Sequence, residues 1–389
     1  MKTTHVNVDK VNILIKGLLL AVYVFFILLI SLFAFRKPYY NWDMLAYMAI
    51  VIKMDHHKDV NQIHSITYDL ARKNIPPTEY GYLVTSPYRE KMATSPDDFY
   101  AQLSFYAVKP LYIGMIYLFY KIGFSLPIST LLPSILSYFL IGLLLFHWLQ
   151  KCTKPFFAFI AGLLIMFSPF MVSIARRSTP DSLSSFLLFA AFYFIIEKPS
   201  ISWMFLFFIL SIFARLDNIV TCFIISSFLF FNSKWQKQIT IWQYMIILLF
   251  FVICYFSITF IIVRPFGWNI LYYPTFIQYY NLSHQFHTVS PLKAYFALSY
   301  SQAITAIVFH NFTLFAFLAL LITSPFSTLF RNLKFEQLFS LLLIFIILVR
   351  FILYPDLADR FYISFYLSIL VLLVKKYSNG QVIQSVSVR

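Results

Sequence analysis

Carboxylate and guanidinium groups stand together at three places in this sequence, and a lone carboxylate stands at a fourth. All four places adjoin long apolar runs: NWDMLAYMAI, SIARRSTPDSL, FARLDN and DLADRFYISFY. Their charged members are Asp43, then Arg176, Arg177 and Asp181, then Arg215 and Asp217, and last Asp356, Asp359 and Arg360. Carboxylates beside several arginines suit a reaction that removes a proton and holds an anion.

These side-chain types favour a transfer reaction with a phosphate leaving group. A guanidinium fork binds phosphate oxygens in pairs and stays charged at any pH. Asp43 stands beside Trp42 at the end of an apolar run, a partly desolvated position that suits a general base. The sequence contains no glycine-rich nucleotide loop, so transfer from a lipid phosphate fits best. The main catalytic task is then to stabilise charge on the departing phosphate.

Each cluster also has a structural interpretation. Asp43 and Asp181 suit helix caps, and Arg176 and Arg177 suit side chains that extend to lipid headgroups. Two considerations favour function over structure. Arginines on the outer side of a membrane oppose the usual charge bias, and ion pairs at the membrane boundary are costly.

The composition predicts the elements that carry these clusters. The chain has 389 residues, of which 60% are hydrophobic and 12% charged, and its mean hydropathy is +0.77. A soluble protein of this size cannot bury so much apolar surface. The net charge of +15 comes from scattered basic residues, which excludes a nucleic-acid-binding module. We therefore expect an all-α polytopic membrane protein with membrane lipid as a partner.

Apolar runs predict about ten transmembrane helices in a single domain, 1–389. The expected spans are 14–35, 128–149, 155–175, 182–196, 200–214, 219–232, 239–263, 303–323, 335–354 and 361–374. The regions between and after them are a large first outer loop (36–127), a second outer loop (264–302) and a cytoplasmic tail (375–389). The first span reads as an uncleaved helix, because no small-residue cleavage site follows it.

The segment 108–124 decides on which side each later loop lies. It is short for a span and carries Lys109 and Lys121, so we place it as an interfacial helix. One set of loops then carries mostly lysine, and the opposite set pairs arginine with aspartate. Lysine-rich loops are typical of the cytoplasmic side. The N-terminus is therefore expected in the cytoplasm and the Arg–Asp loops on the outer face.

The first outer loop is expected to contain amphipathic or interfacial helices. One helix should begin near Asp43, and another at Ser95, with Pro96 at its first position. The stretch 74–88 between them reads as an extended, turn-rich strip. The histidines of the two outer loops match no zinc spacing and are better explained as solvated side chains: His56, His57, His64, His284 and His287.

In these residues the chain resembles the GT-C superfamily of polytopic glycosyltransferases, which use polyprenyl-phosphate-linked or polyprenyl-diphosphate-linked sugars. YYNWDMLAYMA is similar to the acidic motif of that family's first outer loop. FIAGLLIMFSPFMVSIARRSTPDSLSSFLLFAAFYFII is similar to its span, outer turn, acidic residue and second span, as in the oligosaccharyltransferase, protein-mannosyltransferase and bacterial membrane branches. LSIFARLDN and ADRFYISFY resemble its later arginine motifs.

The resemblance implies roles for individual residues. Asp43 would be the catalytic acid/base or a carboxylate that orients the acceptor, and Asp181 would help to form the active site or bind a metal. The expected donor-phosphate ligands are Arg176, Arg177, Arg215, Arg360 and Lys109, with Asp217 and Asp359 as supporting residues. The first-loop motif has one carboxylate where the family often has two, which leaves open whether a divalent metal such as Mg or Mn is used.

The expected function is transfer of a sugar from a polyprenyl-phosphate-linked or polyprenyl-diphosphate-linked donor to an envelope acceptor (a glycolipid, polysaccharide or protein) at the outer face of the membrane. The chain ends soon after its last expected span, so glycolipid or polysaccharide acceptors are favoured over peptides. Two alternatives stay open: a transporter or flippase for a lipid-linked glycan, and a polysaccharide polymerase or ligase. The expected location is a bacterial inner membrane, with the site facing the periplasm; the sequence leaves the oligomeric state open.

Overall fold

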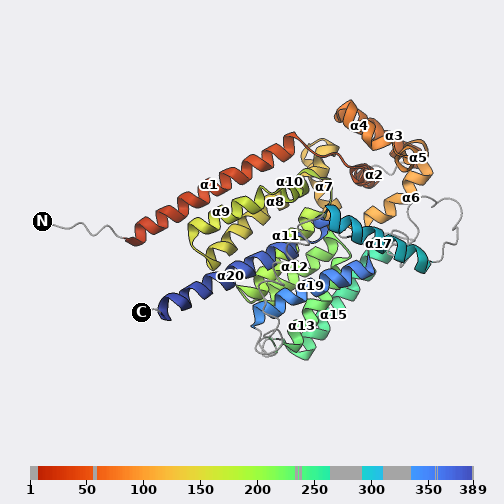
Figure 1. Ribbon diagram of the computed structural model, residues 1–389. Coiled ribbons are helices and arrows are strands. Elements are labelled where there is room, and N and C mark those ends of the chain that lie inside the picture. Colours follow the sequence, from red (N-terminus) through yellow and green to blue (C-terminus); the bar gives the residue numbers. More distant parts are fainter. Residues whose placement is uncertain are drawn as a thin grey trace.

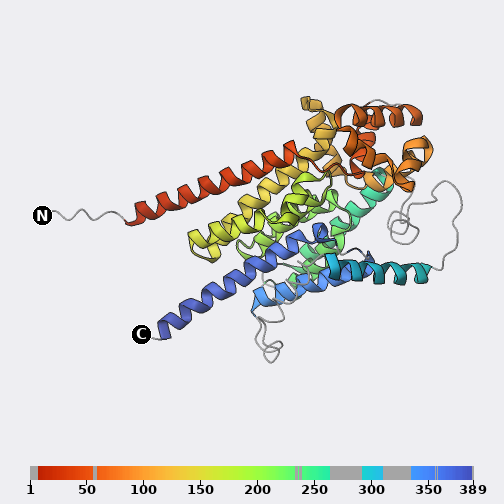
Figure 2. The same cartoon turned by 45° about the horizontal axis from the view of Figure 1, so that its top comes forward.

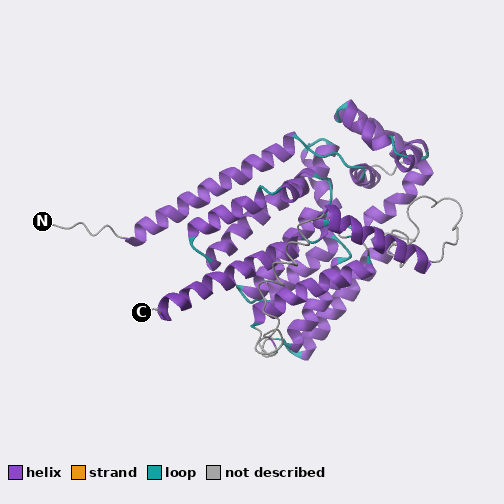
Figure 3. Ribbon diagram, viewed as in Figure 1, coloured by secondary structure: helices purple, strands orange, loops and turns teal. Residues whose placement is uncertain are grey.

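The computed structural model describes residues 8–55, 59–232, 235, 239–262, 291–309, 334–354, 356 and 358–387, and most of these residues are helical. Within these ranges the single β-type pairing is an isolated bridge between Tyr39 and Arg177. The all-α class is therefore confirmed for the described residues, and Figure 3 shows helices joined by short loops.

The longer helices run side by side as one bundle (Figure 1). In chain order the helices are α1 (Val8–Arg36), α2 (Asp43–Asp55), α3 (Val60–Asn74), α4 (Pro77–Val84), α5 (Pro87–Thr94), α6 (Pro96–Ala107), α7 (Pro110–Ile122), α8 (Leu126–Cys152), α9 (Pro155–Met166), α10 (Pro169–Arg176), α11 (Asp181–Ile196), α12 (Ile201–Ala214), α13 (Asn218–Phe231), α15 (Ile241–Phe256), the π-helix η1 (Ser257–Ile262), α17 (Pro291–Phe309), α19 (Phe335–Leu353), the 3₁₀-helix η5 (Asp359–Phe361) and α20 (Ile363–Ser387).

Four helical segments are long and apolar enough to cross a membrane: Ile13–Arg36, Leu126–Cys152, Ile241–Phe260 and Phe335–Leu353. Two bent pairs qualify if each is counted as one span, namely α6 with α7 at 109° and α9 with α10 at 60°. The expected spans 182–196, 200–214 and 219–232 form α11, α12 and α13, which have 16, 14 and 14 residues. Such helices measure roughly 21–24 Å, less than a hydrocarbon layer of about 30 Å. The described residues thus support four to six spans by length, and the count of ten is not confirmed.

Several expected boundaries differ from the structure. The expected span 155–175 divides at Ser168, because Pro169 begins α10 and a proline is tolerated in the first turn of a new helix. The expected second outer loop is helical from Pro291 onward, where α17 begins. Residues 263–290 and 310–333 lie outside the described residues. The expected tail is helical through Ser387 as part of α20.

The segment expected to be the first outer loop folds into the six helices α2–α7, which we call the cap. The predicted starts of α2 at Asp43 and of α6 after Ser95 are confirmed, and the Ser95 hydroxyl accepts from the backbone N–H of Asp98. The prediction of an extended strip over 74–88 is wrong. Helices α4 and α5 occupy most of it, since Pro77 and Pro87 each stand in a first turn, where a proline costs no hydrogen bond.

Helix α2 forms the centre of the cap rather than an amphipathic surface helix. Every residue from Met44 to Ile52 is buried, and α2 contacts α3, α6, α7 and α8. Its neighbours include the buried side chains of Tyr68, Phe99 and Tyr112. A helix covered on all sides has one position and one orientation, which fixes the side chain at its first residue, Asp43.

The two ends of the bundle differ in charge chemistry. The cap lies at one end, and α1 begins and α20 ends at the other (Figures 1 and 2). The Arg–Asp turns lie at the cap end. At the far end Lys375 pairs with Glu197 at 2.7 Å, and the Lys151 amine donates to the Tyr193 hydroxyl at 2.8 Å. The predicted division of the loops into two sets thus corresponds to the two ends.

The first prediction concerns the close packing between α1 and α9 and its effect on stability. A Cβ at Gly162 would lie 2.9 Å from the ring of Tyr23, which stacks on Phe146 and donates to the Gly142 carbonyl. Because that ring is held in place, Gly162→Ala is expected to destabilise the protein by about 1 kcal/mol despite alanine's higher helix propensity. Thermal unfolding in detergent measures this. Gly114→Ala on α7, where a Cβ meets open space, should be neutral or stabilising; equal melting temperatures for the two variants would contradict the prediction.

Candidate active site

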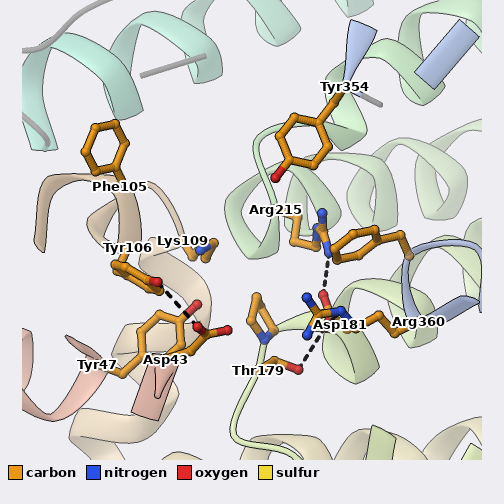
Figure 4. A pocket seen from close by; sticks show the side chains of 12 residues that line it. Asp43, Tyr47, Phe105, Tyr106, Lys109, Thr179, Asp181, Arg215, Tyr354 and Arg360 are labelled. Carbon is orange, nitrogen blue, oxygen red and sulfur yellow. Dashed lines mark hydrogen bonds and ion pairs between the residues drawn. The ribbon is translucent and has the colours of Figure 1, made fainter. Parts of the chain in front are cut away.

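A cavity of about 300 Å³ lies where the cap meets the bundle. Figure 4 shows side chains from both converging on it. Its lining residues come from α2, the α6–α7 junction, the turn before α11, the α12–α13 turn and the segment around η5. They are Asp43, Tyr47, Phe105, Tyr106, Lys109, Thr179, Pro180, Asp181, Arg215, Tyr354, Arg360 and Phe361.

The segment after α1 pairs directly with the turn before α11. The Tyr39 backbone N–H donates to the Arg176 carbonyl at 2.7 Å. The backbone N–H of Ser178 donates to the Asn41 side chain at 3.2 Å, and Arg176 donates to the Lys37 carbonyl at 2.6 Å. These contacts bring the first-loop motif and the ARRSTPD turn side by side at one end of the bundle.

Asp43 forms the cap side of the cavity. The Tyr106 hydroxyl donates to its Oδ1 at 3.3 Å, and Tyr47 lines the cavity one helical turn later. This carboxylate is therefore held by weak contacts and remains open toward the cavity.

Lys109 lies beside Asp43 at the start of α7. Its amine lies 4.8 Å from the ring centre of Tyr106 and 5.4 Å from that of Tyr47. Desolvation within the cavity lowers the pKa of Lys109 to about 8, and the charge of Asp43 partly opposes this. Across the described part of the chain, its amine has no hydrogen-bond acceptor or carboxylate partner. Its donors are therefore available to a ligand.

Asp181 forms the opposite side and is 3% exposed. It begins α11 and binds Arg215 through Oδ1. Its Oδ2 accepts from the Thr179 hydroxyl at 2.9 Å and lies 3.6 Å from Arg360 Nε. With both oxygens engaged, Asp181 organises the arginines around it and is less suited than Asp43 to accept a proton.

Two carboxylates, those of Asp217 and Asp181, occupy most of the hydrogen-bond donors of Arg215. Its Nε and Nη2 donate to the two oxygens of Asp217, each at 3.0 Å, while Nη1 binds Asp181. Burial alone would lower the pKa of Arg215, but Asp217 and Asp181 raise it overall. For Asp217 the two effects have the opposite signs: burial alone would raise the pKa of this carboxylate, but the nearby charges of Arg215 and Arg350 lower it overall. These groups stay ionised at physiological pH.

Arg350, which sequence reasoning missed, completes this ion-pair network from α19. Its side chain is 6% exposed; it pairs with Asp217, and its Nη1 lies 3.4 Å from the Asn218 side-chain oxygen. An arginine within a predicted span was a signal that the sequence did contain, because such residues seldom lack a function or a partner. The three arginines and two aspartates of the network join α11, the α12–α13 turn, α19 and η5.

Arg360 is the more accessible arginine of the cavity, with 30% of its side chain exposed. The ring of Phe361 lies 4.7 Å from its guanidinium and 4.2 Å from that of Arg215. Burial lowers the pKa of Arg360, but Asp181 and Asp43 raise it overall. Arg360 thus presents a permanent positive charge to the cavity, across from Asp43 (Figure 4).

The structure brings together most, not all, of the residues expected at the site. Five line the cavity: Asp43, Asp181, Arg215, Arg360 and Lys109. Four lie outside its lining: Arg176, Arg177, Asp217 and Asp359. Arg177 lies 4.8 Å from the ring of Tyr39 and donates to Ser173. Sequence reasoning also missed Tyr47 and Tyr106, because no pattern distinguishes them from other interfacial tyrosines.

The residues of the cavity do not fit a divalent metal. Within the described ranges no three His, Cys, Asp or Glu side chains are placed to hold an ion. Asp181 is engaged by two arginines, so Asp43 has no second carboxylate to share a cation. His64 bonds to the Met92 carbonyl at 3.0 Å; His56, His57, His284 and His287 lie outside the described residues. No step is therefore assigned to Mg or Mn.

Comparison of this chain with family models, curated proteins and solved structures found no match. The GT-C resemblance therefore stays a prediction, and the chemistry of the cavity is judged from its residues.

The second prediction concerns the contribution of the ion-pair network to stability. Arg215→Met would leave the buried Asp181 without its closest cation, so we expect a loss of about 3 kcal/mol in stability. The control is Arg36→Met at the exposed end of α1, which should change stability by less than about 0.5 kcal/mol. Thermal unfolding in detergent compares the two. Identical melting temperatures would show that the network does not stabilise the fold.

Proposed function

We propose that this protein is an integral membrane glycosyltransferase. It moves a sugar from a polyprenyl-phosphate-linked donor to a hydroxyl group of an envelope acceptor such as a glycolipid or polysaccharide. The observation that best supports this is a single cavity with Asp43 and Lys109 on the cap side and Arg360 across from them. Such a cavity holds a proton acceptor and phosphate ligands within reach of one substrate.

Lys109 and Arg360 are the proposed phosphate ligands. Arg215 has its guanidinium fork on Asp217 and a further bond to Asp181, so it positions Asp181 and Arg360 rather than the donor. Lys109 has no anionic partner among the described residues, and Arg360 has one carboxylate at 3.6 Å. A phosphate that enters the cavity offers both cations a closer anion.

The proposed reaction is a direct displacement with inversion at the anomeric carbon. The acceptor hydroxyl passes its proton to Asp43 while its oxygen attacks that carbon. The bond from the anomeric carbon to the phosphate oxygen breaks, and its electron pair leaves with the lipid phosphate. Lys109 and Arg360 stabilise the negative charge that develops there, which is the largest electrostatic demand of the step.

A lipid-linked donor is favoured by the surroundings of the cavity. Four to six helical segments suit membrane spans, and the chain has no glycine-rich nucleotide loop. We place the N-terminus in the cytoplasm and the cavity at the periplasmic face of a bacterial inner membrane, with about ten crossings. The lysine-rich loops at the end opposite the cap support that orientation.

The third prediction concerns the base. Asp43→Asn keeps the side chain's shape but cannot accept the proton, so the rate of sugar transfer should fall about 10²–10⁴-fold while the melting temperature stays unchanged. The control is Asp59→Asn at the N-cap of α3, where asparagine caps equally well. Transfer is measured with purified protein, a labelled polyprenyl-phosphate sugar and membrane lipid acceptors. Undiminished transfer by Asp43→Asn would exclude the assigned base, and translocation of the lipid without sugar transfer would favour a flippase.

The fourth prediction is a pH dependence set by Lys109. Because its pKa is lowered to about 8, this lysine is charged below that pH and neutral above it. The ratio kcat/KM for the donor should therefore fall above pH 8, about tenfold per pH unit. Lys109→Arg, which stays charged, should remove that alkaline decline.

The matched control is Lys53→Arg, which alters another cap lysine that lies over a tyrosine ring, 4.7 Å from Tyr100, outside the cavity lining. It should leave the profile as in the unaltered protein. An alkaline decline that persists in Lys109→Arg would show that another group sets it.

A further inference from the structure

A second cavity, of about 360 Å³, lies at the end of the bundle opposite the cap. The start of α1, the last turns of α8 and the α8–α9 connection line it. Its lining residues are Lys16, His147, Gln150, Lys151, Thr153 and Pro155. Its volume is within the range of small-molecule sites, about 300–1,000 Å³, and none of the described residues that line it is a carboxylate.

Two basic side chains of this cavity are held in place by one tyrosine, and its two lysines are not neutralised. The Lys151 amine donates to the Tyr193 hydroxyl at 2.8 Å, and His147 Nε2 lies 3.0 Å from the same oxygen. Neither Lys16 nor Lys151 pairs with a carboxylate in the described part of the chain. Lys375, at the same end, is by contrast neutralised by Glu197 and Glu336. The cavity therefore has an unbalanced positive charge that suits an anion.

Apolar surface adjoins the cavity on both helices that flank it. Ile13 and Leu20 of α1 are exposed, as are Phe156 and Leu164 of α9. In a membrane these side chains face acyl chains, so an anion that binds here with its own apolar tails gains contacts that a free anion lacks. Basic pockets between helices on the cytoplasmic side are a recognised type of site for anionic lipid headgroups.

We propose that this cavity binds the phosphate of an anionic phospholipid headgroup, with Lys16 and Lys151 as its cations and the acyl chains along α1 and α9. The site is separate from the glycosyl-transfer cavity and does not depend on that function. It would fasten α1 to the α8–α9 turn at the membrane surface.

The fifth prediction tests this with full-length protein in a neutral detergent, titrated with fluorescent phosphatidylglycerol and, in parallel, with the matching phosphatidylcholine. The unaltered protein should bind phosphatidylglycerol more tightly. The double variant Lys16→Gln/Lys151→Gln should weaken that binding about tenfold and leave binding of phosphatidylcholine unchanged. The matched control Lys154→Gln/Lys198→Gln removes two exposed lysines outside the lining and should keep the full affinity.

Three results would overturn the proposal. Unchanged affinity in the Lys16/Lys151 variant would show that the cavity is not the site. An equal loss in both double variants would show a general effect of surface charge. Displacement of the lipid by millimolar inorganic phosphate would assign the cavity to a free anion rather than to a headgroup.

Discussion

The arrangement of the cavity depends on one constraint: buried charges must be paired. Asp181 is almost fully buried and Arg350 nearly so, and removing such ions from water costs several kcal/mol each. The cost is offset where Asp181 and Asp217 each bind two arginines. Since these residues come from α11, the α12–α13 turn, α19 and η5, satisfying them holds four segments in one geometry. The bundle side of the cavity is rigid for this reason.

The ion-pair network engages some cations of the site fully and leaves others available to a ligand. Arg215 donates to Asp181 and Asp217. Arg350 donates to Asp217 and to the Asn218 amide oxygen. Both arginines therefore hold the geometry of the network. Among the described residues, Lys109 and Arg360 keep donors for a ligand, and the hydrogen bond to Asp43 comes from the Tyr106 hydroxyl at 3.3 Å. A polar cavity is useful for catalysis when its walls are satisfied and its reactive groups are not. The cavity beneath the cap has that character.

Charged side chains are paired differently at the two ends of the molecule. At the cap end, Asp181 and Asp217 pair with Arg215, Arg350 and Arg360, while Arg176 donates to a backbone carbonyl and Arg177 to a serine hydroxyl. At the far end, Lys375 is neutralised, while Lys16 and Lys151 line a cavity that has no acid among its described residues. The described part of the protein thus has an organised ion-pair network at one end of the bundle and unpaired lysines at the other.

The sequence by itself determined what depends on local chemistry. Apolar runs predicted helices, Ser95 with Pro96 predicted the start of α6, and the Arg–Asp turns marked the cavity end, because helix caps and hydrophobic runs act over a few residues. Tertiary structure alone decided that α2 is buried, that Arg177 lies outside the cavity lining, and that Arg350 rather than solvent completes the pairing of Asp217. These outcomes depend on which distant segments meet, and no spacing within one segment encodes that. The assembled fold therefore determines whether a charged side chain is paired within the protein or remains available to a substrate.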